Sequence, residues 1–431
     1  MQRFLRTGTS LRRFSSLQAS AMKRVVGSLQ SNVDIESNTS LWLGAAAVDE
    51  PTMSILDPSP GFTAATAHRS FNLTQDFDRL QNGEAVTDCV YINTPVDADP
   101  FELIKDNIVS VSASIKTILG SDHPVLEAVA KYYTDDFFEN DGGKKIRPTM
   151  ILLLAQAAEA ARDPLSTDKS LEYIAASQQR LAEVTEMIHT ASLLHDDVID
   201  EADTRRGMKS VNKVFGSKLS ILAGDFLLAR SSICLARLRS LEAVELMSTA
   251  IEHLVKGEVM QMRHADKNGT ISPFEYYLRK NYYKTGSLMA NSCRAALILG
   301  EHSADVCELG FAYGRHLGLA FQLIDDVLDY KGENTGKPML ADLKAGLATA
   351  PVLLAQEEFP VLKELVARKF STAGDIELAA DLVEKSVGLQ KSKDLAIIQA
   401  ELAILAIMQY PPSPARDALV KLAQLVVTRS K

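Results

Sequence analysis

The sequence predicts an all-α protein in which a bundle of long helices surrounds a central cavity. Two observations support this prediction. From Pro100 onward, apolar residues recur at helical spacing in long blocks, whereas the alternation of β-branched residues that is typical of strands is rare. Gly-rich breaks are also few, so the blocks are long enough to form the helices of a bundle. The clearest blocks are residues 150–161, 178–194, 219–235, 244–262 and 312–328.

Composition narrows the classes of function. The chain has 431 residues and is 46% hydrophobic, which suffices for one large domain with an extension or for two ordinary domains. Its formal net charge of −9 argues against a nucleic-acid-binding protein, which usually presents a basic face. The four cysteines form no CxxC pair, which argues against zinc and redox sites. No uncharged apolar run is long enough to predict a transmembrane helix.

The N-terminal region differs from the rest of the chain. Residues 1–33 are rich in Arg, Ser and Thr, and the first acidic residue is Asp34. This composition is typical of an organellar transit peptide, with the mitochondrion expected ahead of the plastid, although a disordered basic tail has the same composition. Residues 34–99 lack sustained periodicity and predict an irregular linker or cover segment. Residues 100–431 form the predicted helical domain.

The pattern Asp-Asp-x-x-Asp occurs twice, each time at the end of an apolar helical run. Residues four apart lie on one face of a helix, so the first and last aspartates of each segment project together. Like charges one turn apart repel each other, and two such pairs therefore predict bound cations. Mg²⁺ binds through one or two carboxylates plus substrate phosphates. The expected ligands are Asp196 and Asp200 in the first cluster and Asp325 and Asp329 in the second.

Basic residues flank the first acidic cluster. Arg205 and Arg206 follow it, and guanidinium groups match phosphate oxygens bidentately; the alternative is a surface pair that neutralises the aspartates. Upstream, two glycines precede Lys144, Lys145 and Arg147, which predicts a second anion site. That segment can also be a simple helix N-terminus, and a single acidic cluster is more often a solvated helix end. The occurrence of two clusters favours the metal site.

Together these motifs resemble the trans-isoprenyl diphosphate synthases, over about residues 100–431. The resemblance implies the isoprenoid synthase fold and a Mg²⁺-dependent prenyltransferase that joins isopentenyl diphosphate to an allylic diphosphate. Five motifs carry it, in the family's order and at compatible spacing: Gly143-Lys144-x-x-Arg147-Pro148, Asp196–Asp200 followed by Arg205-Arg206-Gly207, Gly257-Glu258-x-x-Gln261, Lys284-Thr285, and Phe321-Gln322-x-x-Asp325-Asp326.

The resemblance also implies a role for each matching residue. Asp196 and Asp200, with Asp325 or Asp329 opposite, would hold Mg²⁺, and Asp197 and Asp326 complete the two catalytic motifs. The remaining site residues fall into three groups: Arg205, Lys284 and Lys337 for the allylic diphosphate; Lys144, Arg147, His189 and Arg206 for isopentenyl diphosphate; and Thr285 and Gln322 for the developing cation or nearby phosphates.

One position departs from the family pattern. Where the family often has a second lysine, this chain has Leu347, so Lys337 is preferred over the nearby Lys344 as a phosphate contact. No side-chain general base is evident. This agrees with an ionisation mechanism, in which the allylic diphosphate leaves first and a dry cavity matters more than a titrating residue.

Small residues precede the first acidic cluster, where the resemblance places the tunnel for the growing chain. Ala191 and Ser192 lie one turn before Asp196, and Ile188 and Val184 follow at the next turn. Short-chain members of the family generally have bulky aromatic residues there. The open floor therefore predicts a long product, of roughly six isoprene units or more. With the transit peptide, this indicates an enzyme for the ubiquinone side chain in mitochondria, or alternatively for plastoquinone in plastids.

The resemblance also implies partners. We expect a homodimer, or a heteromer with a degenerate subunit, and peripheral contact with the inner membrane because the product is greasy. Two other functions compete with the synthase. A terpene cyclase would have a different second metal site, whereas both Asp-rich segments are intact here. A non-catalytic regulatory subunit would have lost aspartates, whereas this chain keeps them all.

Overall fold

A computed structural model describes most of the chain from Cys89 onward. The chain divides into two units, Met1–Ser54 and Ile55–Lys431, and every described residue belongs to the second unit. The predicted transit peptide, and the predicted linker as far as residue 88, lie outside the described residues. The described ranges are 89–120, 128–129, 132, 145–160, 174–205, 208–263, 272–331 and 339–429.

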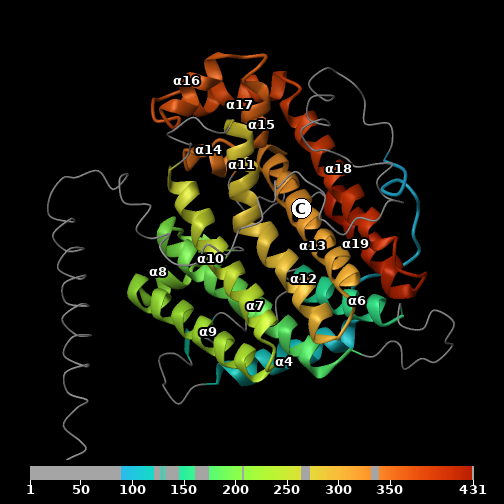
Figure 1. Ribbon diagram of the computed structural model, residues 1–431. Coiled ribbons are helices and arrows are strands. Elements are labelled where there is room, and N and C mark those ends of the chain that lie inside the picture. Colours follow the sequence, from blue (N-terminus) through green and yellow to red (C-terminus); the bar gives the residue numbers. More distant parts are fainter. Residues whose placement is uncertain are drawn as a thin grey trace, which may run out of the picture. The chain divides into compact units, whose positions relative to one another are not determined.

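The described residues confirm the all-α prediction, since their only strands are a two-residue antiparallel pair, β1 (Thr204–Arg205) and β2 (Met208–Lys209) (Figure 1). The helices are α4 (Lys105–Leu119), α6 (Ile146–Ala160), α7 (Ala176–Ile199), α8 (Val211–Phe215), α9 (Ser217–Arg237), α10 (Leu241–Arg263), α11 (Pro273–Asn281), the π-helical turn η4 (Tyr282–Gly286), α12 (Ser287–Leu299), α13 (Ala304–Lys331), α14 (Ala341–Lys344), α15 (Ala350–Ala355), α16 (Val361–Ala367), α17 (Asp375–Lys385), α18 (Gly388–Ile407) and α19 (Pro414–Thr428).

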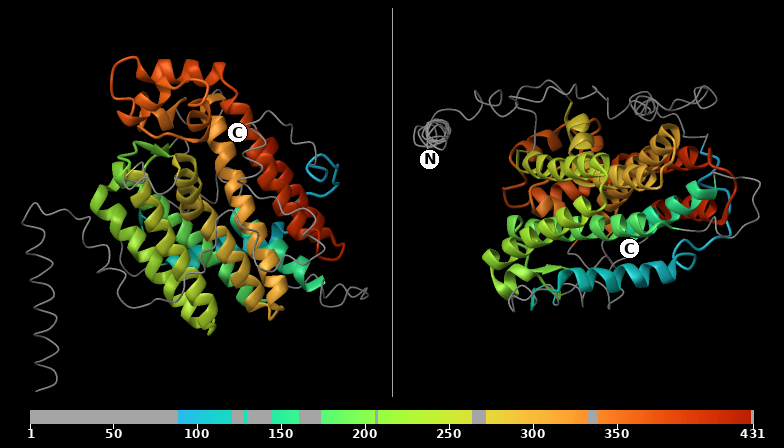
Figure 2. Two further views of the ribbon diagram at one scale, coloured as in Figure 1. Left: turned by 45° about the horizontal axis from the view of Figure 1, so that its top comes forward. Right: turned by 60° about the horizontal axis from the view of Figure 1, so that its bottom comes forward.

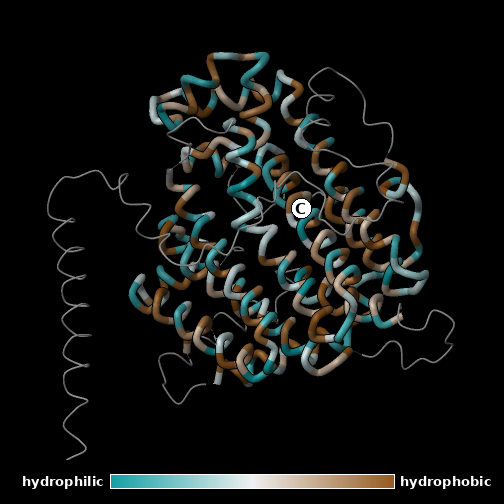
Figure 3. Tube along the Cα trace, viewed as in Figure 1, coloured by the Kyte–Doolittle hydropathy of each residue, from teal (hydrophilic) through white to brown (hydrophobic). Residues whose placement is uncertain are grey.

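Helix α13 is the centre of the packing. It lies along α18 on one side and α12 on the other, and α12 in turn packs against α7 and α10 (Figure 1). Helix α7 packs against α9, α6 and α4, and the right-hand view of Figure 2 shows α4 (cyan) alongside the green helices. Apolar and polar residues alternate along these helices at helical spacing (Figure 3). Their apolar faces form one large buried cluster, which is the hydrophobic core of the bundle.

Local signals explain where several helices begin. The Ser272 side chain accepts a hydrogen bond from the backbone N–H of Glu275, and Pro273 occupies the first position of α11. Helix α19 repeats this arrangement with Ser413 and Pro414. These caps satisfy backbone donors that a helix leaves unpaired at its start, and so they set the ends of α11 and α19.

The segment before the first described helix is fixed to the end of the chain. The buried Glu401 carboxylate of α18 accepts hydrogen bonds from the backbone N–H groups of Tyr91 (3.0 Å) and Ile92 (2.9 Å). The Gln424 amide of α19 donates to the carbonyls of Tyr91 (2.9 Å) and Thr94 (2.7 Å). The described part of this irregular segment is therefore anchored to the domain through its backbone.

Candidate active site

A continuous chain of contacts links the two acidic clusters. Asp196, near the C-terminal end of α7, lies 3.9 Å from the Lys284 ammonium on η4. The next residue, Thr285, donates a hydrogen bond to the Gln322 amide oxygen on α13 (3.2 Å). Gln322 donates in turn to Asp326 (2.9 Å). Residues that are distant in sequence thus form one site, and η4 connects its two acidic sides.

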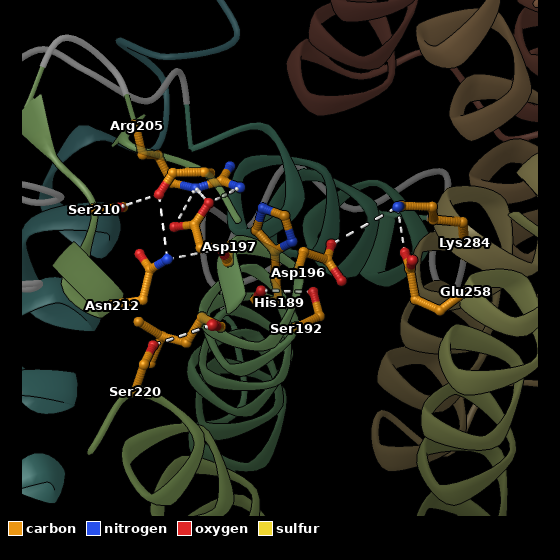
Figure 4. A network of polar contacts seen from close by, with 12 residues as sticks. His189, Ser192, Asp196, Asp197, Arg205, Ser210, Asn212, Ser220, Glu258 and Lys284 are labelled. Carbon is orange, nitrogen blue, oxygen red and sulfur yellow. Dashed lines mark hydrogen bonds and ion pairs between the residues drawn. The ribbon is translucent and has the colours of Figure 1, made fainter. Parts of the chain in front are cut away.

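The Lys284 ammonium lies between the carboxylates of Asp196 and Glu258, as Figure 4 shows. Lys284 forms an ion pair with Glu258 of α10 and donates to the Gln261 side-chain oxygen (3.3 Å). Burial opposes the charge of Lys284, but Asp196 and Glu258 outweigh it, so the Lys284 pKa rises and the ammonium stays charged. The cluster therefore contains one fixed cation beside several carboxylates.

Two carboxylates of the first cluster are poorly compensated. Burial raises the pKa of Asp196 to about 7; Lys284 opposes this rise, while Glu258 and Asp200 add to it. Burial likewise raises the pKa of Asp200. Among the described residues, neither carboxylate accepts a hydrogen bond, and only 14% of the Asp196 side chain is exposed. A bound divalent cation would relieve this excess of negative charge.

Asp197 has a different environment from its neighbour Asp196. Its side chain is 2% exposed and accepts three hydrogen bonds from the Arg205 guanidinium, at 2.7, 2.9 and 2.9 Å. The Asn212 amide donates to the Asp197 backbone carbonyl (2.9 Å). Asp197 thus joins the end of α7 to the short hairpin that carries Arg205. The structure places Arg205 against an aspartate, and its predicted contact with the allylic diphosphate stays a prediction.

The aspartates of the second cluster each have partners. Asp326 is buried and accepts a hydrogen bond from the Tyr277 hydroxyl (2.6 Å) in addition to that from Gln322. Burial raises its pKa to about 6, against the opposing hydrogen bond from Tyr277. The two oxygens of Asp329 accept the backbone N–H groups of Ala341 (3.0 Å) and Asp342 (3.1 Å), at the start of α14.

Asp325 forms an ion pair with Arg429, the last residue that the structure describes. The Arg429 guanidinium contacts the Asp325 carboxylate at 2.5 Å, donates to the Phe321 carbonyl (2.8 Å) and lies over the Phe321 ring at 3.8 Å from its centroid. The Asp325 side chain remains 44% exposed. The last described residue of the chain is therefore part of the second cluster.

The residues fit Mg²⁺ only in combination with a substrate. In the ranges that the structure describes, no three His, Cys, Asp or Glu side chains lie close enough together to hold an ion by themselves. Mg²⁺ commonly uses one or two carboxylates and takes its other ligands from water and phosphate oxygens. The under-compensated pair Asp196 and Asp200 matches this requirement, and the exposed carboxylate of Asp325 can contribute from the opposite side.

The remaining predicted site residues are partly described. His189 projects from the same side of α7 as Asp196 (Figure 4), and Arg147 lies half-buried in the first turn of α6. Lys144, Arg206 and Lys337 lie outside the described residues. The Lys344 ammonium donates to the Met339 carbonyl (2.8 Å).

Several residues of this site had no role predicted from the sequence. Glu258 and Gln261 were part of a motif without a function, and the structure places both at the Lys284 ammonium. Tyr277 and Arg429 carried no signal, because a tyrosine on an apolar helix and an arginine at a chain end are common. Their partners lie 49 and 104 residues away, so only the fold brings them together.

The expected tunnel residues lie in the interior of α7. Val184, Ile188 and Ala191 are fully buried. Ser192 is half-buried, and its hydroxyl donates back to the His189 carbonyl (2.8 Å). All four side chains are non-aromatic, as the sequence analysis noted. The tunnel and the product length stay predictions.

Comparisons with known proteins assign the family. The polyprenyl synthetase family matches residues 123–383. Solanesyl-diphosphate synthase 1, mitochondrial, of Oryza sativa is 47% identical, over 77% of this chain and 79% of that protein. The probable mitochondrial hexaprenyl pyrophosphate synthase of Neurospora crassa is 43% identical, over 77% and 82%. A polyprenyl synthase of Caulobacter crescentus, solved with calcium and isoprenyl diphosphate, superposes with a TM-score of 0.66 at 31% identity, over 77% and 97%. The chain therefore belongs to the polyprenyl synthetase family of prenyltransferases.

Proposed function

We propose that this chain is a long-chain trans-polyprenyl diphosphate synthase, which condenses isopentenyl diphosphate repeatedly with an allylic diphosphate such as farnesyl or geranylgeranyl diphosphate. One observation carries the proposal: the chain of contacts from Asp196 through Lys284, Thr285 and Gln322 to Asp326. This arrangement combines two acidic sides with a fixed cation between them. It suits a substrate that carries a diphosphate leaving group.

The proposed roles follow from charge. Asp196 and Asp200, with Asp325 or Asp329 opposite, would hold Mg²⁺, which would neutralise the charge of the diphosphate leaving group. Lys284 would donate hydrogen bonds to the same diphosphate, and its ammonium stays charged because Asp196 and Glu258 raise its pKa. Thr285 and Gln322 stabilise charge that develops near the reacting carbon. Arg205 and Lys337 complete the binding of this substrate.

Isopentenyl diphosphate would bind through a separate set of basic residues: Lys144, Arg147, His189 and Arg206. In the reaction the allylic C–O bond breaks, the isopentenyl double bond attacks the resulting cation, and a new C–C bond forms. A proton is then lost, and the released diphosphate is the proposed acceptor because it is a base that the reaction itself supplies. The chain's own residues orient the two substrates and exclude water.

We further propose that the product is long and serves as the ubiquinone side chain in mitochondria. The small residues Ala191 and Ser192 support an open tunnel. Both the rice and the Neurospora relatives are named as mitochondrial, and their names give solanesyl and hexaprenyl products. The basic segment at residues 1–33 supports import into mitochondria, and a plastid enzyme for plastoquinone is the alternative.

Product analysis tests this function. The purified chain is incubated with Mg²⁺, isopentenyl diphosphate and either farnesyl or geranylgeranyl diphosphate, and the products are separated by chain length. Products of roughly six isoprene units or more are expected. Products that stop at farnesyl or geranylgeranyl length would refute the long-chain proposal. A cyclic hydrocarbon would indicate a terpene cyclase, and turnover only with a second subunit would indicate a regulatory chain.

We also propose a dimer formed through α9 and α10. Val255, Val259 and Met262 are exposed and form one apolar stripe on α10. On α9, Leu222 and Ile233 are also exposed. A second copy of this chain would cover these exposed side chains of α9 and α10, and sedimentation measures the oligomeric state.

Helix α9 is long and apolar enough to cross a membrane by composition alone, but a core helix of a globular domain passes the same test. Peripheral membrane contact stays a prediction.

A further inference from the structure

The π-helical turn η4 carries two residues of the proposed active site, Lys284 and Thr285. A π-helical turn is rare and has less favourable geometry than an α-helix, and such turns frequently occur at functional sites. An unfavourable backbone persists only where the surrounding structure holds it. Helices α10 and α13 both pack against η4 and are placed to hold it in this conformation.

Helix α10 holds η4 through a glycine and a glutamine one turn apart. A Cβ atom at Gly257 would lie 2.9 Å from the backbone nitrogen of Lys284 and 3.1 Å from its Cα. Only glycine therefore permits the observed approach of the two backbones. Four residues later, the Gln261 side-chain oxygen accepts a hydrogen bond from the Lys284 ammonium. Gly257 leaves room for the backbone of the turn, and Gln261 holds the side chain of Lys284.

Helix α13 repeats this arrangement on the other side of η4. A Cβ atom at Gly318 would lie 2.7 Å from the Cα of Gly286, the last residue of the turn. Four residues later, the Gln322 side-chain oxygen accepts a hydrogen bond from the Thr285 hydroxyl. The same Gly-x-x-x-Gln spacing thus occurs on two helices that are separated in sequence and that contact the same turn.

We propose that these two segments form a clamp that positions η4, with Gly257 and Gln261 on one side and Gly318 and Gln322 on the other. Consecutive side chains of η4 face different helices, because Lys284 meets α10 while Thr285 meets α13. The clamp therefore sets the distances to both acidic clusters at once. Gly257, Gln261 and Gly318 are positioning residues, since they act through Lys284 and Thr285.

This inference rests on the proposed function, because it assigns the clamp to the placement of Lys284 beside the reacting diphosphate. A shift of about 1 Å in a positioned group can lower turnover about 100-fold. The clamp predicts such a loss when either glycine is replaced, because the closest contact of each new Cβ atom is with a backbone atom and cannot be relieved by rotating a side chain.

The test compares Gly257→Ala and Gly318→Ala with Gly310→Ala on α13. A Cβ atom at Gly310 meets only side-chain atoms of Leu297 and Leu154, which can move aside. We expect kcat to fall about 100-fold in the two clamp variants and less than about 10-fold in the control, with KM changed much less than kcat. Equal losses in all three variants would overturn the proposal.

Two further measurements separate positioning from general damage. In a Lys284→Ala background, Gly257→Ala should lower kcat little further, because the group that it positions is gone; additive losses would contradict the clamp. Gln261→Leu should lower kcat, and Gln261→Glu should restore most of it because the carboxylate keeps an acceptor for Lys284. Equal activity of the two Gln261 variants would contradict the role of this hydrogen bond.

Hydrogen exchange tests the clamp without turnover. The amides of residues 282–286 should exchange faster in Gly257→Ala and Gly318→Ala than in wild type and in Gly310→Ala. Unchanged exchange in both clamp variants would refute the clamp even if activity fell. Conversely, loss of exchange protection together with an inactive wild-type chain would leave the clamp supported and refute the proposed function instead.

Discussion

Replacing Asp197 by alanine, in parallel with Asp196, tests which aspartate of the first cluster stabilises the fold. The Asp197 carboxylate is 2% exposed and accepts three hydrogen bonds from Arg205, so its removal breaks this ion pair. Breaking a buried ion pair in this way costs about 3–5 kcal/mol. Arg205 is 28% exposed and can be rehydrated, which favours the lower end, about 3 kcal/mol.

The expected shift in melting temperature follows from this free energy. A large domain loses about 2–4 °C for each kcal/mol, so Asp197→Ala should lower Tm by about 6–12 °C. Asp196→Ala should leave Tm nearly unchanged or raise it, because this carboxylate is desolvated beside Glu258 and Asp200. It should nevertheless abolish Mg²⁺-dependent turnover, since Asp196 is a proposed metal ligand.

Thermal unfolding of the metal-free chain and turnover of the same samples measure both effects. Arg205→Ala is the matched control, because it removes the other partner of the same ion pair and should also lower Tm. The reasoning is refuted if Asp196→Ala lowers Tm as much as Asp197→Ala, or if Asp197→Ala changes Tm by less than about 2 °C.

Three further predictions follow from buried or positioned groups. Ala191→Phe should shorten the product, because the ring fills the expected tunnel; product chromatography measures this. Burial, aided by the charge of Arg315, lowers the pKa of His316 to about 3. The folded chain should therefore lose stability as pH falls from about 6.5 towards 3, by up to about 1.4 kcal/mol per pH unit from this residue. Urea unfolding at several pH values measures this loss. Glu401→Gln should lower stability by about 1–3 kcal/mol, since the new amide loses an acceptor for Tyr91 or Ile92.

Each of these predictions has a control and a contrary outcome. Ala191→Ser should keep the product long, and an unchanged product in Ala191→Phe would place the tunnel elsewhere. His316→Gln should show a shallower loss of stability with acid than wild type, because the unfolded chain then gains one proton fewer; an identical pH profile would contradict the shift. Gln424→Leu, which removes the other anchor of the same segment, should also destabilise, and no change in Glu401→Gln would show that the segment contributes little.

Much of the helical architecture was predictable from periodicity. The predicted blocks 178–194, 219–235, 244–262 and 312–328 all lie inside observed helices, because the apolar face of each helix recurs every three to four residues. The start of α7 was less predictable. It depends on Gln178, whose side chain accepts from the Ala175 backbone N–H and donates to the Ala296 carbonyl on another helix.

The candidate site was predictable in its residue types and less so in its contacts. The Asp-rich segments stand out because helical spacing places like charges on one face, whereas Lys284 was identified only through the resemblance to a family. The different environments of Asp196 and Asp197 did not follow from this spacing, since both belong to the same motif. Only the packing of the β-hairpin against α7 gives Asp197 its partner Arg205 and leaves Asp196 facing Lys284.

The sequence by itself determined the fold class and the chemistry of the site, because helical phase and charge are encoded within a few turns of chain. The tertiary structure decided which groups meet. It brings Arg429 to Asp325 across 104 residues and presses a π-helical turn against Gly257 and Gly318. The physical reason is that such pairings depend on how whole helices pack against each other, and no local pattern records that arrangement.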